Sequence, residues 1–351
     1  MQGEMLEQRK LVPYSHIGEE GEKRSAQDLY QLRMAAEQGD DMAQTVLGLY
    51  YLKGKEIAKD FEKAVYWFTK AAEQGNADAQ SLLADCYEFG RGIEENLEKA
   101  VYWYTKSAEQ GDAYGQLVLG FLYEEGERVE KDLQKALYWY MKSAEQGNAR
   151  AQAAVGAFYK FGLGTPQDEK KGIYWLTKSA EQGDEQGQFA LASWYSVGEG
   201  IPKDEEKAVY WYTKSAEQGH ARAQFALALC YHYGEVQDKE KAVYWYTKSA
   251  EQGDADALLA LSCCYKVGVG VPKDEKKAIY WLVKSAEQGN ADGQAALGLC
   301  YFVGAGVPKD QKKAKYWLLK AAEQGNPQAQ AALRFGMRGK RNFQKKKTFD
   351  F

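Results

Sequence analysis

The apolar positions of the chain recur at helical spacing, and glycine and Asx residues interrupt them at regular intervals. In residues 76–111 a first apolar run ends at Gly90, and a second extends from about Leu97 to Gln110. The first run consists of Ala79, Leu82, Leu83, Cys86 and Tyr87. This is the i, i+3, i+4, i+7 spacing of one helix face. The segment therefore predicts two helices, the second closed by Gly111 in the left-handed conformation.

This pair of helices is repeated along most of the chain. The phrase Ala-Glu-Gln-Gly occurs nine times, spaced 36 residues apart seven times and 34 residues apart once. Its closing glycines are Gly39, Gly75, Gly111, Gly147, Gly183, Gly219, Gly253, Gly289 and Gly325. A chain of 351 residues would ordinarily form two domains. The period instead predicts one solenoid over residues 25–336, with eight full helix pairs and flanking half-repeats.

Residues that suit helix ends stand at each predicted boundary. Eight of the nine residues after a closing glycine are Asp or Asn, and His220 is the exception. Asx side chains accept hydrogen bonds from the first backbone amides of a helix. The second helix of each pair is again preceded by Asp or Asn, and the first helix stops at a glycine in all eight pairs. Capping and periodicity therefore predict the same boundaries.

A tyrosine and a tryptophan recur at fixed positions in every pair. The tyrosine stands three residues before the stop glycine, and the tryptophan eight before the closing glycine. The tyrosines are Tyr51, Tyr87, Tyr123, Tyr159, Tyr195, Tyr231, Tyr265 and Tyr301; the tryptophans are Trp67, Trp103, Trp139, Trp175, Trp211, Trp245, Trp281 and Trp317. A helix pair cannot bury its apolar face alone, so an invariant series is favoured as core over a ligand cage.

These motifs carry a family resemblance, clearest in residues 290–325. That segment reads Asn-Ala-x-Gly-Gln-x-x-Leu-Gly-x-x-Tyr-x-x-Gly-x-Gly-Val, then Lys-Asp-x-x-Lys-Ala-x-x-Trp-x-x-Lys-Ala-Ala-Glu-Gln-Gly. It resembles the Sel-one-like repeats, relatives of the tetratricopeptide repeats with a longer inter-helix loop. The resemblance implies an all-α fold, a right-handed α/α superhelical solenoid of helix-turn-helix repeats. It also implies an adaptor, because most members bind other proteins.

Composition and motifs offer no support for catalysis. The net charge of −4 is too balanced for a DNA-binding protein, and three histidines and five cysteines are too few for a zinc or disulfide framework. The chain has no nucleophile elbow, phosphate-binding loop or dinucleotide fingerprint. The sequence therefore predicts a protein without enzymatic activity, cofactor or metal.

The cysteines and histidines have structural interpretations. Cys86, Cys230, Cys264 and Cys300 share one repeat position and are expected to be buried, whereas Cys263 lies on another face. A cysteine-rich branch of the family, associated with β-lactam binding, pairs cysteines between the two helices of each repeat. No second helix here contains a cysteine, so that activity is not carried over. His220, Cys230 and His232 point in different directions on a helix and form an improbable metal site.

The two ends of the chain depart from the repeat. Residues 1–24 are expected to form a flexible leader, and residues 337–351 a basic flexible tail. The tail is interpreted as solvated or, alternatively, as a contact for an acidic partner, RNA or a membrane surface. No segment has the apolar length of a signal peptide or a membrane span. A cytoplasmic protein is the resulting expectation.

The first helices differ from repeat to repeat at positions 3, 6, 10 and 13 after the closing glycine, which share one helix face. We call these positions the variable stripe. First helices line the concave surface of tetratricopeptide-like superhelices, so the resemblance implies a protein-binding groove here. The candidate residues are Tyr114, Leu117, Phe121, Gln186, Phe189, Arg222, Phe225, Leu229, His232 and Phe302. Alternatively, these positions merely drift or seal the helix edge.

The sequence thus predicts an adaptor, of bacterial type, that binds a protein or peptide through the stripe. One alternative is an immunity or virulence protein that engages one specific partner; another is a β-lactam-binding enzyme. The short repeat between Gly219 and Gly253 lacks two loop residues. We expect it to have a tighter loop and to change the pitch of the solenoid locally.

Overall fold

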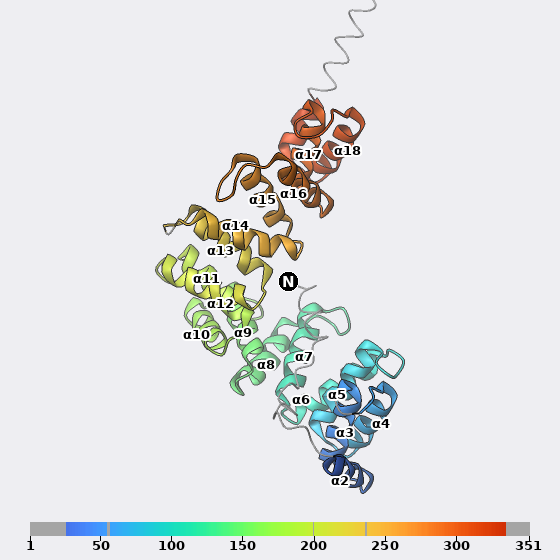
Figure 1. The fold of residues 1–351 in the computed structure, drawn as a ribbon. Coiled ribbons are helices and arrows are strands. Elements are labelled where there is room, and N and C mark those ends of the chain that lie inside the picture. The colour runs from blue at the N-terminus through green and yellow to red at the C-terminus, as the bar shows by residue number, and fades with distance from the viewer. Residues whose placement is uncertain (1–25, 55–56, 199, 236, 335–351) are drawn as a thin grey trace, which may run out of the picture. The chain divides into compact units, whose positions relative to one another are not determined.

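The computed structural model describes residues 26–334 except residues 55–56, 199 and 236, and these residues form helices joined by loops (Figure 1). They divide into two compact units, unit 1 ending at Gln182 and unit 2 beginning at Gly183. The predicted all-α solenoid of helix-turn-helix repeats is confirmed as helix pairs in each unit. The expected leader, residues 1–24, and the basic tail, residues 337–351, lie outside the described residues.

Unit 1 begins with a lone second helix and continues with four helix pairs. Its helices are α2 (Ala26–Glu37), α3 (Asp41–Lys53), α4 (Phe61–Glu73), α5 (Ala77–Phe89), α6 (Leu97–Glu109), α7 (Ala113–Glu125), α8 (Leu133–Glu145), α9 (Ala149–Phe161) and α10 (Glu169–Glu181). From α3 onward, odd-numbered helices are first helices and even-numbered ones are second helices.

Unit 2 contains four further pairs and a terminal helical stretch over residues 327–334. Its helices are α11 (Glu185–Val197), α12 (Glu205–Glu217), α13 (Ala221–Tyr233), α14 (Lys239–Glu251), α15 (Ala255–Val267), α16 (Glu275–Glu287), α17 (Ala291–Val303) and α18 (Gln311–Glu323). Within each unit, a second helix packs on the first helix of its own pair and on that of the next pair.

The helix boundaries follow the predicted capping residues. Asn76 illustrates the rule, because its Oδ1 accepts from the backbone amide of Ala79 at 2.9 Å. Its own amide donates to the carbonyl of Ala71 while Gly75 donates to Ala72, so one residue closes α4 and opens α5. His220 caps α13 in the same way, with Nδ1 accepting from the amide of Ala223 at 3.1 Å. The one residue that is not Asx therefore performs the same function.

Glutamines explain the Ala-Glu-Gln-Gly phrase. Gln44 of α3 is buried, and its Nε2 donates to the carbonyl of Ala36 at 2.9 Å. Gln74, from the next copy of the phrase, donates to Oε1 of Gln44 at 2.8 Å. A buried amide needs such partners, since an unmet hydrogen bond costs stability. The same amide-to-amide bond recurs in later pairs of both units.

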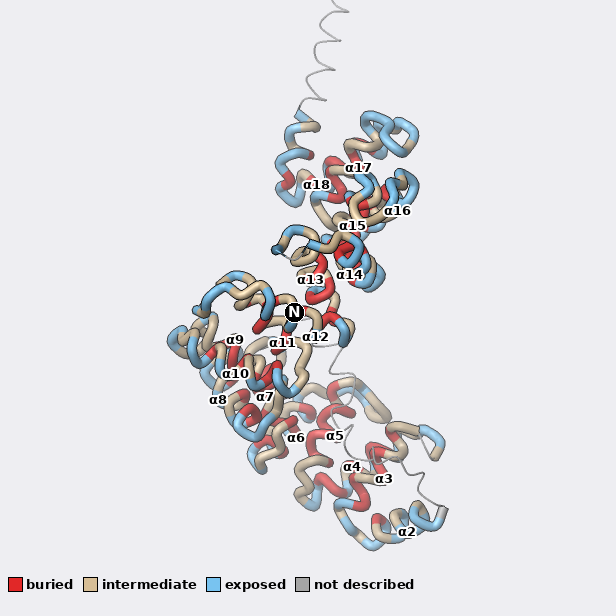
Figure 2. Tube along the Cα trace, turned by 60° about the vertical axis from the view of Figure 1, so that its left-hand side comes forward, coloured by how far each residue is buried: buried red, intermediate tan, exposed pale blue. Residues whose placement is uncertain are grey.

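The recurring aromatics lie at the border of the core and not at its centre. The tryptophans and stop-glycine tyrosines are half-buried, and a lysine of the paired second helix lies over each of those tyrosines. Lys63, for example, lies 5.5 Å from the ring centre of Tyr51. The fully buried position is the residue after the tryptophan, which is Phe68 in α4 and Tyr104 in α6. Figure 2 shows the buried stretches running along the helices.

Candidate protein-binding surface

The predicted stripe residues of unit 2 lie at the surface. Arg222 and Phe302 are exposed, and the other five (Gln186, Phe189, Phe225, Leu229 and His232) are half-buried. Phe189 packs on Tyr212 and His220, with ring centres 5.8 and 4.8 Å apart, and Phe225 packs on Tyr246 at 5.8 Å. These rings are anchored on one side and open to solvent on the other. That they line a concave groove stays a prediction.

The stripe of unit 1 is different, and two of its three candidates are not surface residues. Tyr114 and Phe121 are only 8% and 3% exposed, and Leu117 is half-buried against the core. A side chain packed inside the unit cannot also meet a partner without rearrangement. We therefore correct the sequence prediction and remove Tyr114 and Phe121 from the candidate surface.

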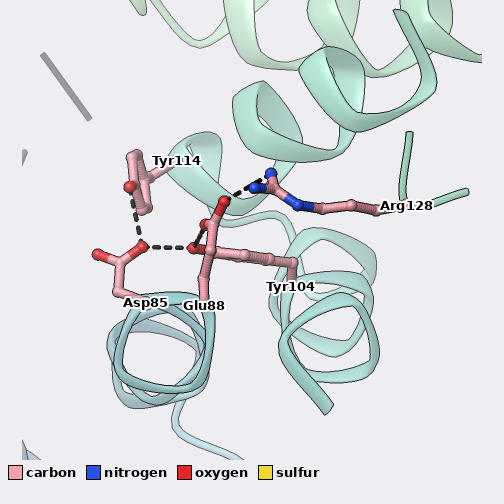
Figure 3. A network of polar contacts seen from close by, with 5 residues as sticks. All are labelled: Asp85, Glu88, Tyr104, Tyr114 and Arg128. Carbon is pink, nitrogen blue, oxygen red and sulfur yellow. Dashed lines mark hydrogen bonds and ion pairs between the residues drawn. The ribbon is translucent and has the colours of Figure 1, made fainter. Parts of the chain in front are cut away.

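A polar network accounts for the burial of Tyr114 (Figure 3). Asp85 and Glu88 of α5 occupy stripe positions and are 5% and 4% exposed. The hydroxyl of Tyr104 lies 2.5 Å from Asp85 Oδ1 and 2.7 Å from Glu88 Oε2, and that of Tyr114 donates to Asp85 Oδ1 at 3.0 Å. Arg128, from the loop after α7, pairs with Glu88 Oε1 at 2.8 Å. The carboxylates are thus held within unit 1.

The residue after the tryptophan matches the stripe in each repeat. Where it is tyrosine, the stripe supplies a polar partner: Tyr140 donates to Glu124 at 2.7 Å and Tyr212 to Ser193 at 3.2 Å. Where it is Phe68, the stripe residues are Leu49 and Leu52. This pairing is visible in the sequence, and it would have separated stripe residues that serve the core from those that do not.

Unit 2 also presents a row of exposed apolar side chains that the sequence analysis missed. Val197, Tyr233, Val267 and Val303 each precede the end of a first helix, and Phe302 adjoins Val303; their exposed fractions lie between 47% and 72%. We call these five residues the edge row. In unit 1 the equivalent residues are Lys53, Phe89, Glu125 and Phe161. An apolar residue before all four stop glycines of unit 2 was the available signal.

The short repeat has the predicted tighter loop at α13. Elsewhere the closing hydrogen bond spans nine residues, as from Asp60 to Tyr51, but here Asp238 donates to Tyr231, seven residues away. Gly234 ends α13 in an extended conformation, with φ −75° and ψ −172°, whereas the described first helices of the other pairs end at a left-handed glycine. The predicted change in solenoid pitch stays a prediction.

At this end of α13, His232 and Tyr233 stack face to face with ring centres 4.2 Å apart. The Nδ1 of His232 lies 3.3 Å from the hydroxyl of Tyr246. Burial, and secondarily the charge of Lys239, lower the pKa of His232 below its ordinary value. The imidazole is therefore neutral near pH 7, and the surface around the edge row gains no charge from it.

The cysteines lie as the repeat positions predict. Cys86 and Cys264 are buried, Cys230 and Cys300 half-buried, and Cys263 exposed, all as free thiols. Burial raises the pKa of Cys86 to about 12 and those of Cys230 and Cys264 to about 11. Among the described residues, no group of three or more His, Cys, Asp or Glu side chains is placed to hold a metal ion. Nor is any described helix long and apolar enough to cross a membrane.

Comparison with known families assigns this architecture. The model of the Sel1 repeat matches residues 41–76, 77–112, 113–148, 149–184, 186–220, 221–254, 255–290 and 291–326. The chain therefore belongs to the Sel1 repeat family, whose repeats mediate interactions with proteins. The comparison with curated proteins gave no significant match.

Solved structures agree with the assignment. A Sel1 repeat protein from Oxalobacter formigenes is 36% identical, with a TM-score of 0.63 over 87% of this chain and 89% of that chain. The protective antigen c5321 of uropathogenic Escherichia coli is 32% identical over 92% of this chain and 85% of that one, with a TM-score of 0.45. A signal transduction ATPase with a tetratricopeptide repeat sensor from Pyrococcus horikoshii shares the fold alone, at 15% identity and a TM-score of 0.51 over 84% and 48% of the two chains.

Proposed function

We propose that this protein is a cytoplasmic adaptor without enzymatic activity, and that it binds a protein or peptide through the first helices of unit 2. The observation that carries the proposal is the edge row, five large apolar side chains exposed at one end of consecutive first helices. Packing within the repeat does not require them, because unit 1 has a lysine and a glutamate at two of the equivalent positions.

The surroundings of the edge row resemble an interface more than a solvated helix edge. Exposed apolar residues that recur on neighbouring elements mark interaction sites in soluble proteins. Phe189 and Phe225, half-buried on the same first helices, supply aromatic rings already fixed by packing. Rigid aromatic anchors lose little entropy on binding and commonly dominate the energy of an interface. Apolar side chains of a partner segment are the chemistry that this surface fits.

Affinity capture followed by a quantitative comparison of variants tests the proposal. A partner captured by the full chain and identified by mass spectrometry would be titrated against Val267→Ser/Phe302→Ser. We expect at least about tenfold weaker binding, the scale of losing interface anchors. Phe161→Ser is the matched control, since Phe161 is 63% exposed at the same repeat position in unit 1. Equal affinities for the two variants would refute the assignment of the surface to unit 2.

A further inference from the structure

Charge is distributed very unequally along the chain. Residues 309–351 contain twelve Lys and Arg against three Asp and Glu, a net charge of +9. The whole chain carries −4, so residues 1–308 carry −13. A segment of this charge on an otherwise acidic protein attracts anionic surfaces.

The described part of this segment includes a basic face on α18. Lys312, Lys315 and Lys320 are exposed there, together with Tyr316 and Leu319. Their separations of three and four residues place them on one side of the helix. Lys320 Nζ lies 4.9 Å from the ring centre of Tyr316. Apolar and cationic groups thus occur side by side on one rigid surface.

This face sets α18 apart from the other second helices. The position of Lys315 holds Val, Leu or Ile in the seven preceding pairs. In the two pairs before it, that aliphatic side chain lies against the next loop, Val243 beside Gly270 and Ile279 beside Gly306. Residues 326–334 follow α18 as a helical stretch and supply no such loop. A lysine can therefore stand at position 315 without loss of packing.

Leu319 has no comparable structural reason. Five of the equivalent positions hold threonine, all half-buried, whereas Leu319 is 39% exposed. The last repeat of a solenoid needs a polar outer face for solubility, and an exposed leucine opposes that need. Its place among three lysines calls for a ligand that is both anionic and apolar.

The sequence after α18 continues the same chemistry. Residues 335–351, which lie outside the described part, add six Lys and Arg and four phenylalanines. Cationic side chains bind the headgroups of anionic lipids, while aromatic and aliphatic ones enter the boundary between headgroups and acyl chains. RNA would bind the same cations through its phosphates, but it offers no apolar layer for Leu319. The combination favours a bilayer.

We propose that the outward face of α18, together with residues 335–351, docks on the surface of an anionic lipid bilayer. This face lies on a second helix, whereas the proposed protein-binding surface lies on first helices, so either site can fail without the other. Each lysine at the membrane surface contributes roughly a fivefold factor to partitioning. Three lysines and the basic segment together suffice for reversible binding.

Vesicle co-sedimentation of the full chain tests the proposal. Vesicles of phosphatidylcholine alone are compared with vesicles containing about 30 mol% phosphatidylserine. The variants are Lys312→Gln/Lys315→Gln/Lys320→Gln, Lys345→Gln/Lys346→Gln/Lys347→Gln and Leu319→Thr. The last introduces the residue that five other repeats carry. Lys214→Gln/Lys248→Gln is the matched control, because both lysines occupy the repeat position of Lys320.

We expect the wild type to sediment only with the anionic vesicles. Either triple variant should bind at least about tenfold more weakly, Leu319→Thr about two- to threefold more weakly, and the control like the wild type. Circular dichroism would verify that each variant is folded. No sedimentation with phosphatidylserine, or unchanged binding of the α18 variants, would overturn the proposal. So would binding to an RNA oligonucleotide that depends on the same lysines while vesicles remain unbound.

Discussion

The two units build the same helix pairs but differ in how they use the variable stripe. In unit 1, helices α3, α5 and α7 bury seven, nine and eight of their thirteen residues. In unit 2, the four first helices bury five, four, five and five. Unit 1 converts its stripe into core, partly through the network of Asp85, Glu88 and Arg128. Unit 2 leaves the same positions open and adds the edge row.

This contrast shows which part of a repeat is free to carry function. Caps, buried glutamines and small helix-contact residues are common to both units, so they serve the pair itself. The stripe and the residue after the tryptophan change together, because a buried tyrosine hydroxyl needs a partner. A repeat with an apolar or open stripe folds equally well, and that freedom allows unit 2 to present a surface.

The largest expected effect is on the network of unit 1. Arg128→Met leaves the carboxylate of Glu88, whose side chain is 1% exposed, without its cationic partner. We expect a loss of about 3 kcal/mol in the free energy of unfolding, as for breaking a buried ion pair. Urea denaturation measures it.

An apolar replacement provides the matching control. Combining Arg128→Met with Asp85→Leu, Glu88→Leu and Tyr104→Phe installs the residues that α3 and α4 carry at these positions, Leu49, Leu52 and Phe68. Most of the lost stability should return, because no buried charge then remains. A cost below about 1 kcal/mol for Arg128→Met alone would mean that the network does not hold this face closed.

A second comparison distinguishes surface from core within unit 2. Trp211 packs against the core of its pair, while Phe225 is open to solvent on one side. We expect Trp211→Ala to cost about 3 kcal/mol and Phe225→Ser about 1 kcal/mol, since half a ring leaves the core. Thermal and urea unfolding measure both. If Phe225→Ser unfolds the protein as severely as Trp211→Ala, the stripe of unit 2 is core as well.

A smaller effect depends on pH and belongs to unit 1. Burial raises the pKa of Glu124 above its ordinary value of 4.5, although the hydroxyl of Tyr140 opposes the shift. A raised folded-state pKa contributes stability below the unfolded pKa, and that contribution is lost as the pH rises through the folded value. Glu124→Gln should therefore remove part of the stability loss between about pH 4 and pH 7, by less than about 1 kcal/mol.

The exposed Glu127 supplies the control for this experiment. Glu127→Gln should leave the pH profile of unfolding unchanged, whereas Glu124→Gln should flatten it. If Glu124→Gln instead lowered stability across the whole range, the carboxylate would be needed in its charged form and the account of its burial would be wrong.

The smallest perturbation uses thiol chemistry. Cys263 lies on the open stripe of unit 2 and should be alkylated first, while Cys86 and Cys264, buried and with raised pKa values, should react slowly. Maleimide labelling followed by mass spectrometry measures each rate. Cys263→Ser should remove the fast phase. Two or more fast thiols would contradict the assignment of helix faces.

Much of this architecture could be predicted from the sequence because its signals are local. Capping residues and glycine stops depend on a few neighbouring residues, and the structure confirms the helix limits that they indicate. His220 replaced Asn or Asp without moving the boundary of α13. Gly234 kept its place but not its left-handed conformation, since the shorter loop leaves α13 in another direction.

The surface was harder to predict because burial depends on residues distant in sequence. Tyr114 and Phe121 occupy the same repeat positions as residues open to solvent in unit 2, yet α5, α8 and neighbouring side chains cover them in unit 1. Variation between repeats cannot distinguish these two environments. The matched change at the residue after the tryptophan does, as Tyr104 with Asp85 shows.

Site-specific photo-crosslinking in cells tests the central claim most directly. A photoreactive phenylalanine analogue would replace Val267 of the edge row in one protein and Phe161, its exposed counterpart in unit 1, in another. We predict one discrete protein adduct at position 267 and none at position 161. The same adduct at both positions, or an adduct at 161 alone, would contradict the assignment of the binding surface to unit 2.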